Sequence, residues 1–131
     1  MDRQLISSGS PFESVMGYSR GVRVGDRVVL AGTAPQWPDG TVDPDVGAQA
    51  RRCFEIIGAA LEAAGASFGD VVRTRVYLVD AADFEAVAAV HGEVFREIRP
   101  ANTTVVVKAL LNDAWRMEIE VEAIAGSAAG A

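Results

Sequence analysis

Strict alternation of apolar and charged residues marks the last regular segment of the chain, residues 115–123. The odd positions are apolar and the even positions are charged: Trp115, Met117, Ile119, Val121 and Ala123 alternate with Arg116, Glu118, Glu120 and Glu122. A period of two predicts a β-strand with one buried face and one polar face. Three successive carboxylates on one face repel one another, so we expect that face to meet water, arginine or a ligand.

A second alternating segment spans residues 70–79. Its even positions, Val72, Thr74, Val76 and Leu78, are predicted to face the core, and its odd positions include Arg73, Arg75 and Tyr77. If both segments share a sheet, Arg73 and Arg75 can neutralise the glutamates directly or across a subunit boundary. The alternative is a solvated face whose surface ion pairs have little energetic value.

The rest of the chain predicts further strands and two helices. Residues 3–7 fit a short edge strand, and residues 18–24 and 27–33 flank Gly25-Asp26 at the two-residue spacing of a hairpin. Residues 8–11 break any regular element, and the proline-containing residues 34–43 form a loop. The first helix is expected to begin at Asp43 as cap with Pro44 at its first position, and to close at Gly65. It presents an apolar stripe of Val46, Ala50, Cys53, Phe54, Ile57, Leu61 and Ala64.

The second helix is predicted to begin with Asp80 as cap and to stop before Pro100. One side of it carries Phe84, Val87, His91, Val94, Phe95 and Ile98. For His91 we favour a packed side chain bonded to a backbone carbonyl over a general base. For Cys53 we favour a small buried hydrophobe over a reactive thiol. Together the elements predict one α+β domain over residues 1–125, with about six strands, two helices on one face and a frayed tail over residues 126–131.

Composition argues against several classes of function. The net charge is −6, and the eleven arginines and the single lysine, Lys108, are scattered, so we do not expect nucleic acid as a partner. A single cysteine and a single histidine cannot build a disulfide or a metal centre. There is no glycine-rich phosphate loop or glycine-flanked nucleophilic serine, and we expect no cofactor. No membrane span and no signal-peptide pattern is present, so the expectation is a cytoplasmic protein without a membrane partner.

Seven fragments in order carry a resemblance to a known family. They are GYSR at 17–20, VLAGTAP at 29–35, QAR at 49–51, AGASFGDVVRT at 64–74, YLVD at 77–80, RPA at 99–101 and MEIE at 117–120. By these fragments the chain resembles the RidA/YjgF (Rid, formerly L-PSP endoribonuclease) family over nearly its whole length. The resemblance implies a chorismate-mutase-like fold and a homotrimer whose sheets form a central barrel, with three clefts between subunits.

The resemblance also implies chemistry and site residues. Archetypal members hydrolyse 2-imino or 2-aminoacrylate species to 2-keto acids and ammonia without a cofactor. In them an arginine after Pro-Ala binds the substrate carboxylate, a glutamate of the last strand positions water, and a tyrosine lines the cleft. Here Tyr18 matches the tyrosine, and Glu120 or Glu118 matches the glutamate. Asn102 stands at the arginine's position, as in divergent Rid subgroups, and this argues against tight binding of 2-imino acids.

Three functions follow as hypotheses. The first is an enzyme acting on an imine, enamine or carbonyl-derived small molecule in an intersubunit cleft, with Glu120, Glu118 and Tyr18 as catalytic residues. The predicted substrate-binding residues are Asn102, Thr103, Arg20, Arg73, Arg75 and Gly32. The second is a trimer that binds a metabolite or partner without turnover. The third, an endoribonuclease, is disfavoured because the chain is acidic and has one histidine.

Overall fold

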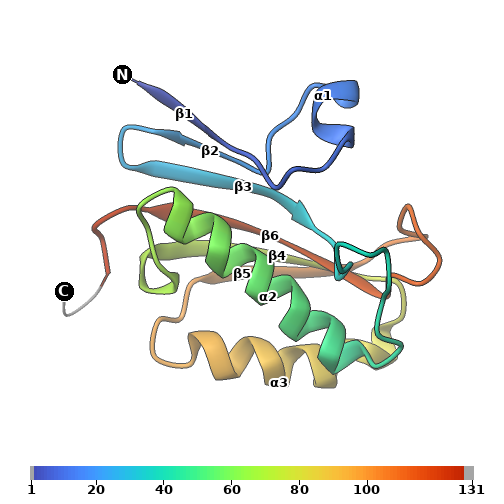
Figure 1. Cartoon of the computed structure of the whole chain (residues 1–131). Coiled ribbons are helices and arrows are strands. Elements are labelled where there is room, and N and C mark those ends of the chain that lie inside the picture. Colours follow the sequence, from blue (N-terminus) through green and yellow to red (C-terminus); the bar gives the residue numbers. More distant parts are fainter. Residues whose placement is uncertain (1, 129–131) are drawn as a thin grey trace.

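Six strands form one mixed sheet in the computed structural model, which describes residues 2–128 (Figure 1). The strands are β1 (Arg3–Ile6), β2 (Gly21–Val24), β3 (Arg27–Thr33), β4 (Val71–Leu78), β5 (Ala101–Val106) and β6 (Met117–Ile124). Their order across the sheet is β1-β2-β3-β6-β4-β5, and only the β4–β5 pair is parallel. The predicted α+β class, six strands, edge strand and hairpin are confirmed.

Two long helices, α2 (Val46–Ala63) and α3 (Phe84–Phe95), lie on the same side of the sheet (Figure 1). All seven residues of the stripe predicted for the first helix are buried against the sheet. The stripe of α3 is buried only in part, because Phe84 is 50% exposed while Val87 and Phe95 are covered. Among residues 2–128 no helix covers the opposite side of the sheet, and that side carries the glutamates of β6 (Figure 1).

The first helix begins later than predicted. Its cap is Asp45, whose carboxylate accepts a hydrogen bond from the Ala48 N–H at 2.9 Å. The predicted cap, Asp43, instead accepts the N–H of Asp45 at 2.8 Å and so forms a turn of its own. Pro44 therefore lies in this turn, because the local aspartate contact competes with the helix for the same backbone.

A β-bulge changes the start of β4. Val71 is 3% exposed and Val72 is 42% exposed, so the prediction that Val72 faces the core is wrong. The pairing with β6 shifts by one residue between Val71 and Arg73, which turns the side chains before the shift to the other face. Beyond the bulge Thr74, Val76 and Leu78 are buried as predicted.

A short helix that the sequence did not predict, α1 (Phe12–Met16), projects from the β1–β2 connection (Figure 1). None of its residues is buried, and Phe12, Val15 and Met16 are exposed. One turn of helix is too short to show an apolar period, and so it carries no sequence signal. A 3-10 turn (Ala81–Asp83), capped by the predicted Asp80, likewise precedes α3.

Hydrogen bonds hold the end of the described chain. The Ser127 hydroxyl donates to the Ile124 carbonyl at 2.6 Å, and the Ala128 N–H donates to Asp70 Oδ1 at 2.9 Å. Residues 129–131 of the predicted frayed tail lie outside the described residues. Within residues 2–128, none of the helices has both the length and the apolar character that a membrane span requires.

Candidate functional site

The uncovered face of the sheet brings the predicted arginines and glutamates together. Arg75 lies opposite Glu120 in the β4–β6 ladder, and its Nη1 is 3.5 Å from a carboxylate oxygen of both Glu120 and Glu122. The Tyr77 hydroxyl donates to the other oxygen of Glu120. Glu120 therefore has a partner on each oxygen, and of the two alternatives left open by the sequence, Arg75 forms direct ion pairs with the glutamates on a face that is still partly exposed. Arg73 lies beside them in register but forms no ion pair within residues 2–128.

Glu118 differs from its neighbours. No hydrogen bond or ion pair holds its carboxyl group among the described residues. Burial raises the pKa of Glu118; Arg20 opposes this effect, and the charge of Glu120 adds to it. Gly32 lies beside it, because a Cβ at position 32 would be in ordinary van der Waals contact with Glu118 Oε2, at 3.5 Å. Glu118 is thus a partly desolvated carboxyl whose oxygens are open to a ligand or water.

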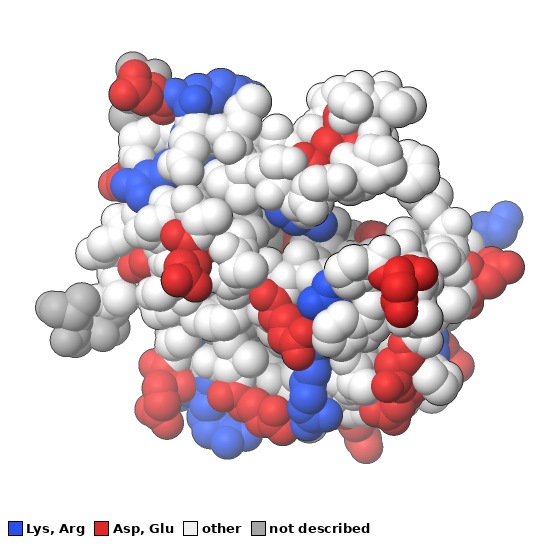
Figure 2. Space-filling model, in the orientation of Figure 1, with Lys and Arg blue, Asp and Glu red and all other residues white. Residues whose placement is uncertain are grey.

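On the uncovered face of the sheet, Arg20 is the cation whose features best suit a ligand-binding group. Its Nη2 donates to the Gly32 carbonyl at 2.7 Å, and its Nε is buried without a hydrogen-bond partner in the described part of the chain. Burial lowers the pKa of Arg20, and Tyr18 and Glu118 act against that shift. We refer to Tyr18, Arg20, Gly32 and Glu118 as the Glu118 cluster. Figure 2 shows the surface hollowed between α1 and the loop after β3, with charged side chains inside the hollow.

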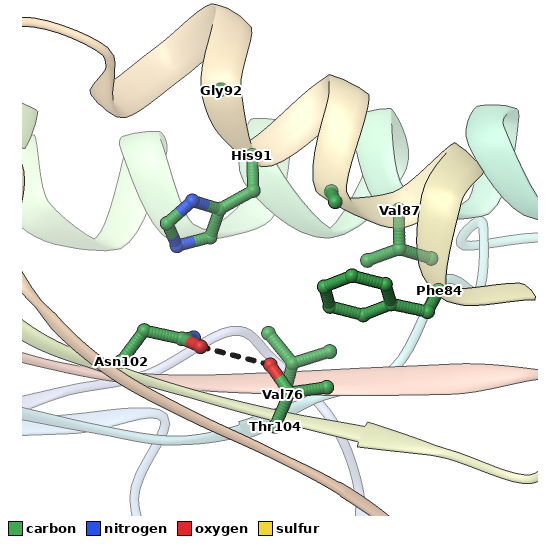
Figure 3. A pocket seen from close by; sticks show the side chains of 8 residues that line it. Val76, Phe84, Val87, His91, Gly92, Asn102 and Thr104 are labelled. Carbon is green, nitrogen blue, oxygen red and sulfur yellow. Dashed lines mark hydrogen bonds between the residues drawn. The ribbon is translucent and has the colours of Figure 1, made fainter. Parts of the chain in front are cut away.

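A separate pocket of about 230 Å³ lies between α3 and β5 (Figure 3). Phe84 and Val87 stand at one end of it, and His91 and Asn102 stand at the other. The full lining is Val76, Phe84, Val87, Ala88, His91, Gly92, Asn102 and Thr104. The pocket is therefore mainly apolar, with uncharged polar groups at one end.

Hydrogen bonds join the polar groups of this pocket into a chain. The Thr104 hydroxyl donates to Asn102 Oδ1 at 2.9 Å (Figure 3), and Asn102 Nδ2 in turn donates to Thr74 Oγ1 at 3.0 Å. Thr74 Oγ1 also lies 2.9 Å from His91 Nε2. The partner of His91 is thus a threonine hydroxyl, and the predicted backbone carbonyl is wrong. The reason is that the bond is made across the layers, from α3 to the fully buried Thr74 of β4.

The chain of hydrogen bonds favours neutral His91. Because Thr74 Oγ1 accepts from Asn102, its own hydroxyl hydrogen can be donated to Nε2, which requires a neutral ring protonated on Nδ1. Burial also lowers the pKa of His91. The ring packs at 4.7 Å from the Phe95 ring centroid, which keeps it in an apolar setting.

The lowered pKa of His91 predicts a pH dependence of stability. The unfolded state binds a proton near the ordinary pKa of about 6.5, and the folded state binds it only at lower pH. The free energy of unfolding should therefore fall as the pH drops from above about 6.5 through the folded-state pKa. Urea titrations of the protein and of His91→Gln at several pH values test this. Parallel curves over that window would contradict it.

The structure places Asn102 and Thr103, both predicted to bind substrate, on opposite faces of the sheet. Asn102 faces α3, whereas Thr103 lies in register with Arg75 on the side of the glutamates. Within one chain, Asn102 and the Glu118 cluster are therefore on opposite faces of the sheet. Sequence reasoning missed Thr74 as a partner of Asn102 and His91. A threonine at a core-facing position between valines was the available signal, since a buried hydroxyl needs a partner.

Cys53 is fully buried, with its Sγ 3.2 Å from the Thr33 carbonyl oxygen and 3.5 Å from Met117 Sδ. Burial raises the pKa of this thiol well above its usual range. The expectation of a packed small hydrophobe is confirmed. The structure contains no group of three His, Cys, Asp or Glu side chains placed to hold a metal ion, within residues 2–128.

Comparisons with known proteins agree with this fold. The family model described as Endoribonuclease L-PSP matches residues 9–125. The chain is 37% identical to the 2-iminobutanoate/2-iminopropanoate deaminase of Salmonella typhimurium, over 95% of this chain and 98% of that protein. Among solved structures it is similar to Rv2704 of Mycobacterium tuberculosis, a member of the YjgF/YER057c/UK114 family, with 43% identity and a TM-score of 0.87 over 94% of this chain and 99% of that one. It is also similar to E. coli TdcF with bound serine, with 31% identity and a TM-score of 0.78 over 92% of each chain.

Proposed function

Since the chain belongs to the L-PSP endoribonuclease (RidA/YjgF) family, we propose that it is an enzyme acting on an imine, enamine or related carbonyl-derived small molecule. The reaction would be hydrolysis or proton transfer. The observation that carries this proposal is Glu118, a partly desolvated carboxyl without a partner among residues 2–128, beside Arg20 and Gly32. A raised pKa suits a carboxyl that takes a proton from water and returns it within one cycle.

The proposed site lies in a cleft between subunits of a homotrimer. Two features support this arrangement. The Glu118 cluster and the pocket between α3 and β5 lie on opposite faces of the sheet, so one chain alone does not bring them together, and we propose that each is half of a site. The uncovered face also exposes Val29, Val72 and Val105 by 38–42%, and a bare, partly apolar sheet face favours association with another copy.

For hydrolysis, the proposed steps follow from proton balance. The imine enters as its iminium form, having taken one proton from solvent, and Glu118 accepts a proton from water while the water oxygen attacks the iminium carbon to give a neutral carbinolamine. Glu118 then returns its proton to the carbinolamine nitrogen. The C–N bond breaks and releases ammonia while the hydroxyl proton passes to solvent, which leaves the carbonyl product. Asn102 and adjacent backbone amides would hold the carbonyl oxygen or imine nitrogen from the facing half-site.

Of the three arginines considered as replacements for the missing family arginine, Arg20 has the best support. It has a buried Nε without a partner among residues 2–128, and it stands near Glu118. Arg75 is already paired with two glutamates. This supports Arg20 as the cation that stabilises negative charge next to the reacting centre.

The test is hydrolysis of freshly generated 2-iminopropanoate by the purified protein, run beside an uncharged imine of similar size. We expect acceleration of at least one of them over the uncatalysed rate in the same buffer. Turnover of the 2-imino acid would mean that another cation serves in place of the lost arginine. Failure to accelerate either imine would overturn the proposed function.

A second candidate is binding of a small molecule without turnover. The related E. coli structure with bound serine favours it, because it holds an intact amino acid. A ligand-dependent rise in melting temperature without product would support this candidate. For the third candidate, an endoribonuclease, a salt titration that detects no RNA binding at low ionic strength would be sufficient to reject it.

A further inference from the structure

A second, more open hollow adjoins the polar end of the pocket between α3 and β5. This hollow is lined by His91, Gly92, Phe95, Arg96, Arg99 and Pro100. The two spaces share His91 and Gly92 in their linings. In Figure 3 these two residues stand at the end of the pocket away from Phe84. The two spaces are therefore neighbours on either side of His91 and Gly92.

The second hollow is locally basic in an acidic protein. Two arginines line it and no carboxylate does. Neither Arg96 nor Arg99 forms an ion pair or a side-chain hydrogen bond within residues 2–128. The nearest acidic residues in sequence are Glu93 and Glu97. Glu93 is paired with Arg51 at 3.1 Å, and neither one lines the hollow. The two guanidinium groups are thus available to an anion.

Arg99 is held in a costly backbone conformation. Its φ of 58° makes it the non-glycine residue with positive φ among the residues described, and its N–H donates to the Phe95 carbonyl at 2.8 Å as it ends the helical segment. Glycine is the usual residue at such a position. The following Pro100 restricts residue 99 further, away from helical geometry. The protein is less stable with arginine at this position than it would be with glycine. A functional role of the arginine side chain would explain why arginine is present.

Gly92 is a second residue whose type is unfavourable at its position in the backbone. It lies inside α3, where glycine is less favourable than alanine. A Cβ at this position would lie 3.3 Å from Arg96 Nη2, a tight contact that the flexible Arg96 side chain can relieve by a small shift. Gly92 and Arg96 thus lie together where the two hollows meet. The strained Arg99 and the helical Gly92 both border the basic hollow.

We propose that Arg96 and Arg99 form an anion subsite, and that the ligand is a small organic acid whose apolar body occupies the pocket between α3 and β5. Its uncharged polar group would meet Asn102 at the end of that pocket, and its acidic group would lie beyond His91. The inference rests on the proposed function only in taking this pocket as part of the substrate cleft. It adds positive charge on the Asn102 side of the cleft, from residues three and six positions earlier in the chain, whereas Arg20 lies with Glu118 on the other face of the sheet.

The experiment is calorimetric titration with 4-methyl-2-oxopentanoate, a branched organic acid, beside the uncharged ketone 4-methylpentan-2-one. Arg99→Gly and Arg96→Gln should each weaken binding of the acid by about tenfold or more, since each removes a charge-assisted contact. Binding of the ketone should be unchanged in both variants. Arg99→Gly should also melt at or above the temperature of the unmodified protein, because glycine relieves the backbone strain. Arg3→Gln, an exposed arginine on β1, is the matched control and should bind the acid normally.

Unchanged affinity for the acid in both variants would overturn the subsite, and so would failure of the unmodified protein to bind the acid at millimolar concentration. Titration needs no turnover, which separates this result from the proposed function. If binding of the acid depends on the two arginines but neither imine is turned over, the subsite is supported and the proposed enzymatic function is rejected. If an imine is turned over and its KM is unchanged by Arg96→Gln and Arg99→Gly, the proposed enzymatic function is supported and the subsite is rejected.

Discussion

Glu118→Gln is expected to lower turnover of the imine substrate by about 10²–10⁴-fold, the usual contribution of a positioned general acid or base. Glutamine keeps the size of the side chain and its ability to hydrogen-bond, and it loses the capacity to exchange a proton. Glu120→Gln is the matched variant from the same face of β6. It should retain most of the activity, because Glu120 is already bound by Tyr77 and Arg75. Steady-state rates of the two variants test the assignment.

The stability of the Glu118→Gln variant provides a control for its expected loss of turnover. The folded-state pKa of Glu118 is raised above its unfolded value, so ionising this group in the folded protein is unfavourable. Its contribution to the free energy of unfolding is therefore lost as the pH rises from about 4.5 through the folded-state pKa. Glu118→Gln should be at least as stable as the unmodified protein at pH 7. Equal losses of activity in the two glutamine variants would contradict the role of Glu118.

Gln49→Leu is expected to lower the free energy of unfolding by about 3 kcal/mol or more, from several buried backbone groups left without partners. Gln49 is 1% exposed. Its Nε2 donates to the carbonyls of Asp43 and Ala114 at 2.8 and 2.9 Å, and its Oε1 accepts the Arg116 N–H at 2.9 Å. One side chain thus ties the start of α2 to the segment that leads into β6.

Denaturant unfolding at one fixed protein concentration measures this effect, since association would otherwise change the apparent stability. Gln4→Leu is the matched control. Its side chain makes one exposed hydrogen bond, to the Ala63 carbonyl at 2.9 Å, and its loss should cost less than about 1 kcal/mol. If the two variants unfold at the same denaturant concentration, Gln49 does not have the structural role assigned to it. Because Arg116 is two residues before Glu118, Gln49→Leu should also reduce activity.

Patterns of residues close in sequence were sufficient to predict most of the fold. The period of two in residues 115–123 predicted β6 and its buried side, and the stripe from Val46 to Ala64 predicted the face that α2 buries. The Gly25-Asp26 spacing predicted the β2–β3 hairpin. These predictions held because each depends on residues close in sequence. The errors at Asp43 and Val72 have local causes too, a competing aspartate turn and a one-residue bulge, which an apolar pattern does not reveal.

The sequence by itself determined which residues are candidates for chemistry: a glutamate-rich strand, arginines on a neighbouring polar face, and Asn102 at the position where the family resemblance implies arginine. The tertiary structure decided how they are grouped. It paired Glu120 with Arg75 and Tyr77, left Glu118 without such partners among residues 2–128, and joined Asn102 to His91 through Thr74. The physical reason is that pKa and hydrogen bonding depend on burial and on neighbours across the sheet, and these are set by strand order and register rather than by sequence spacing.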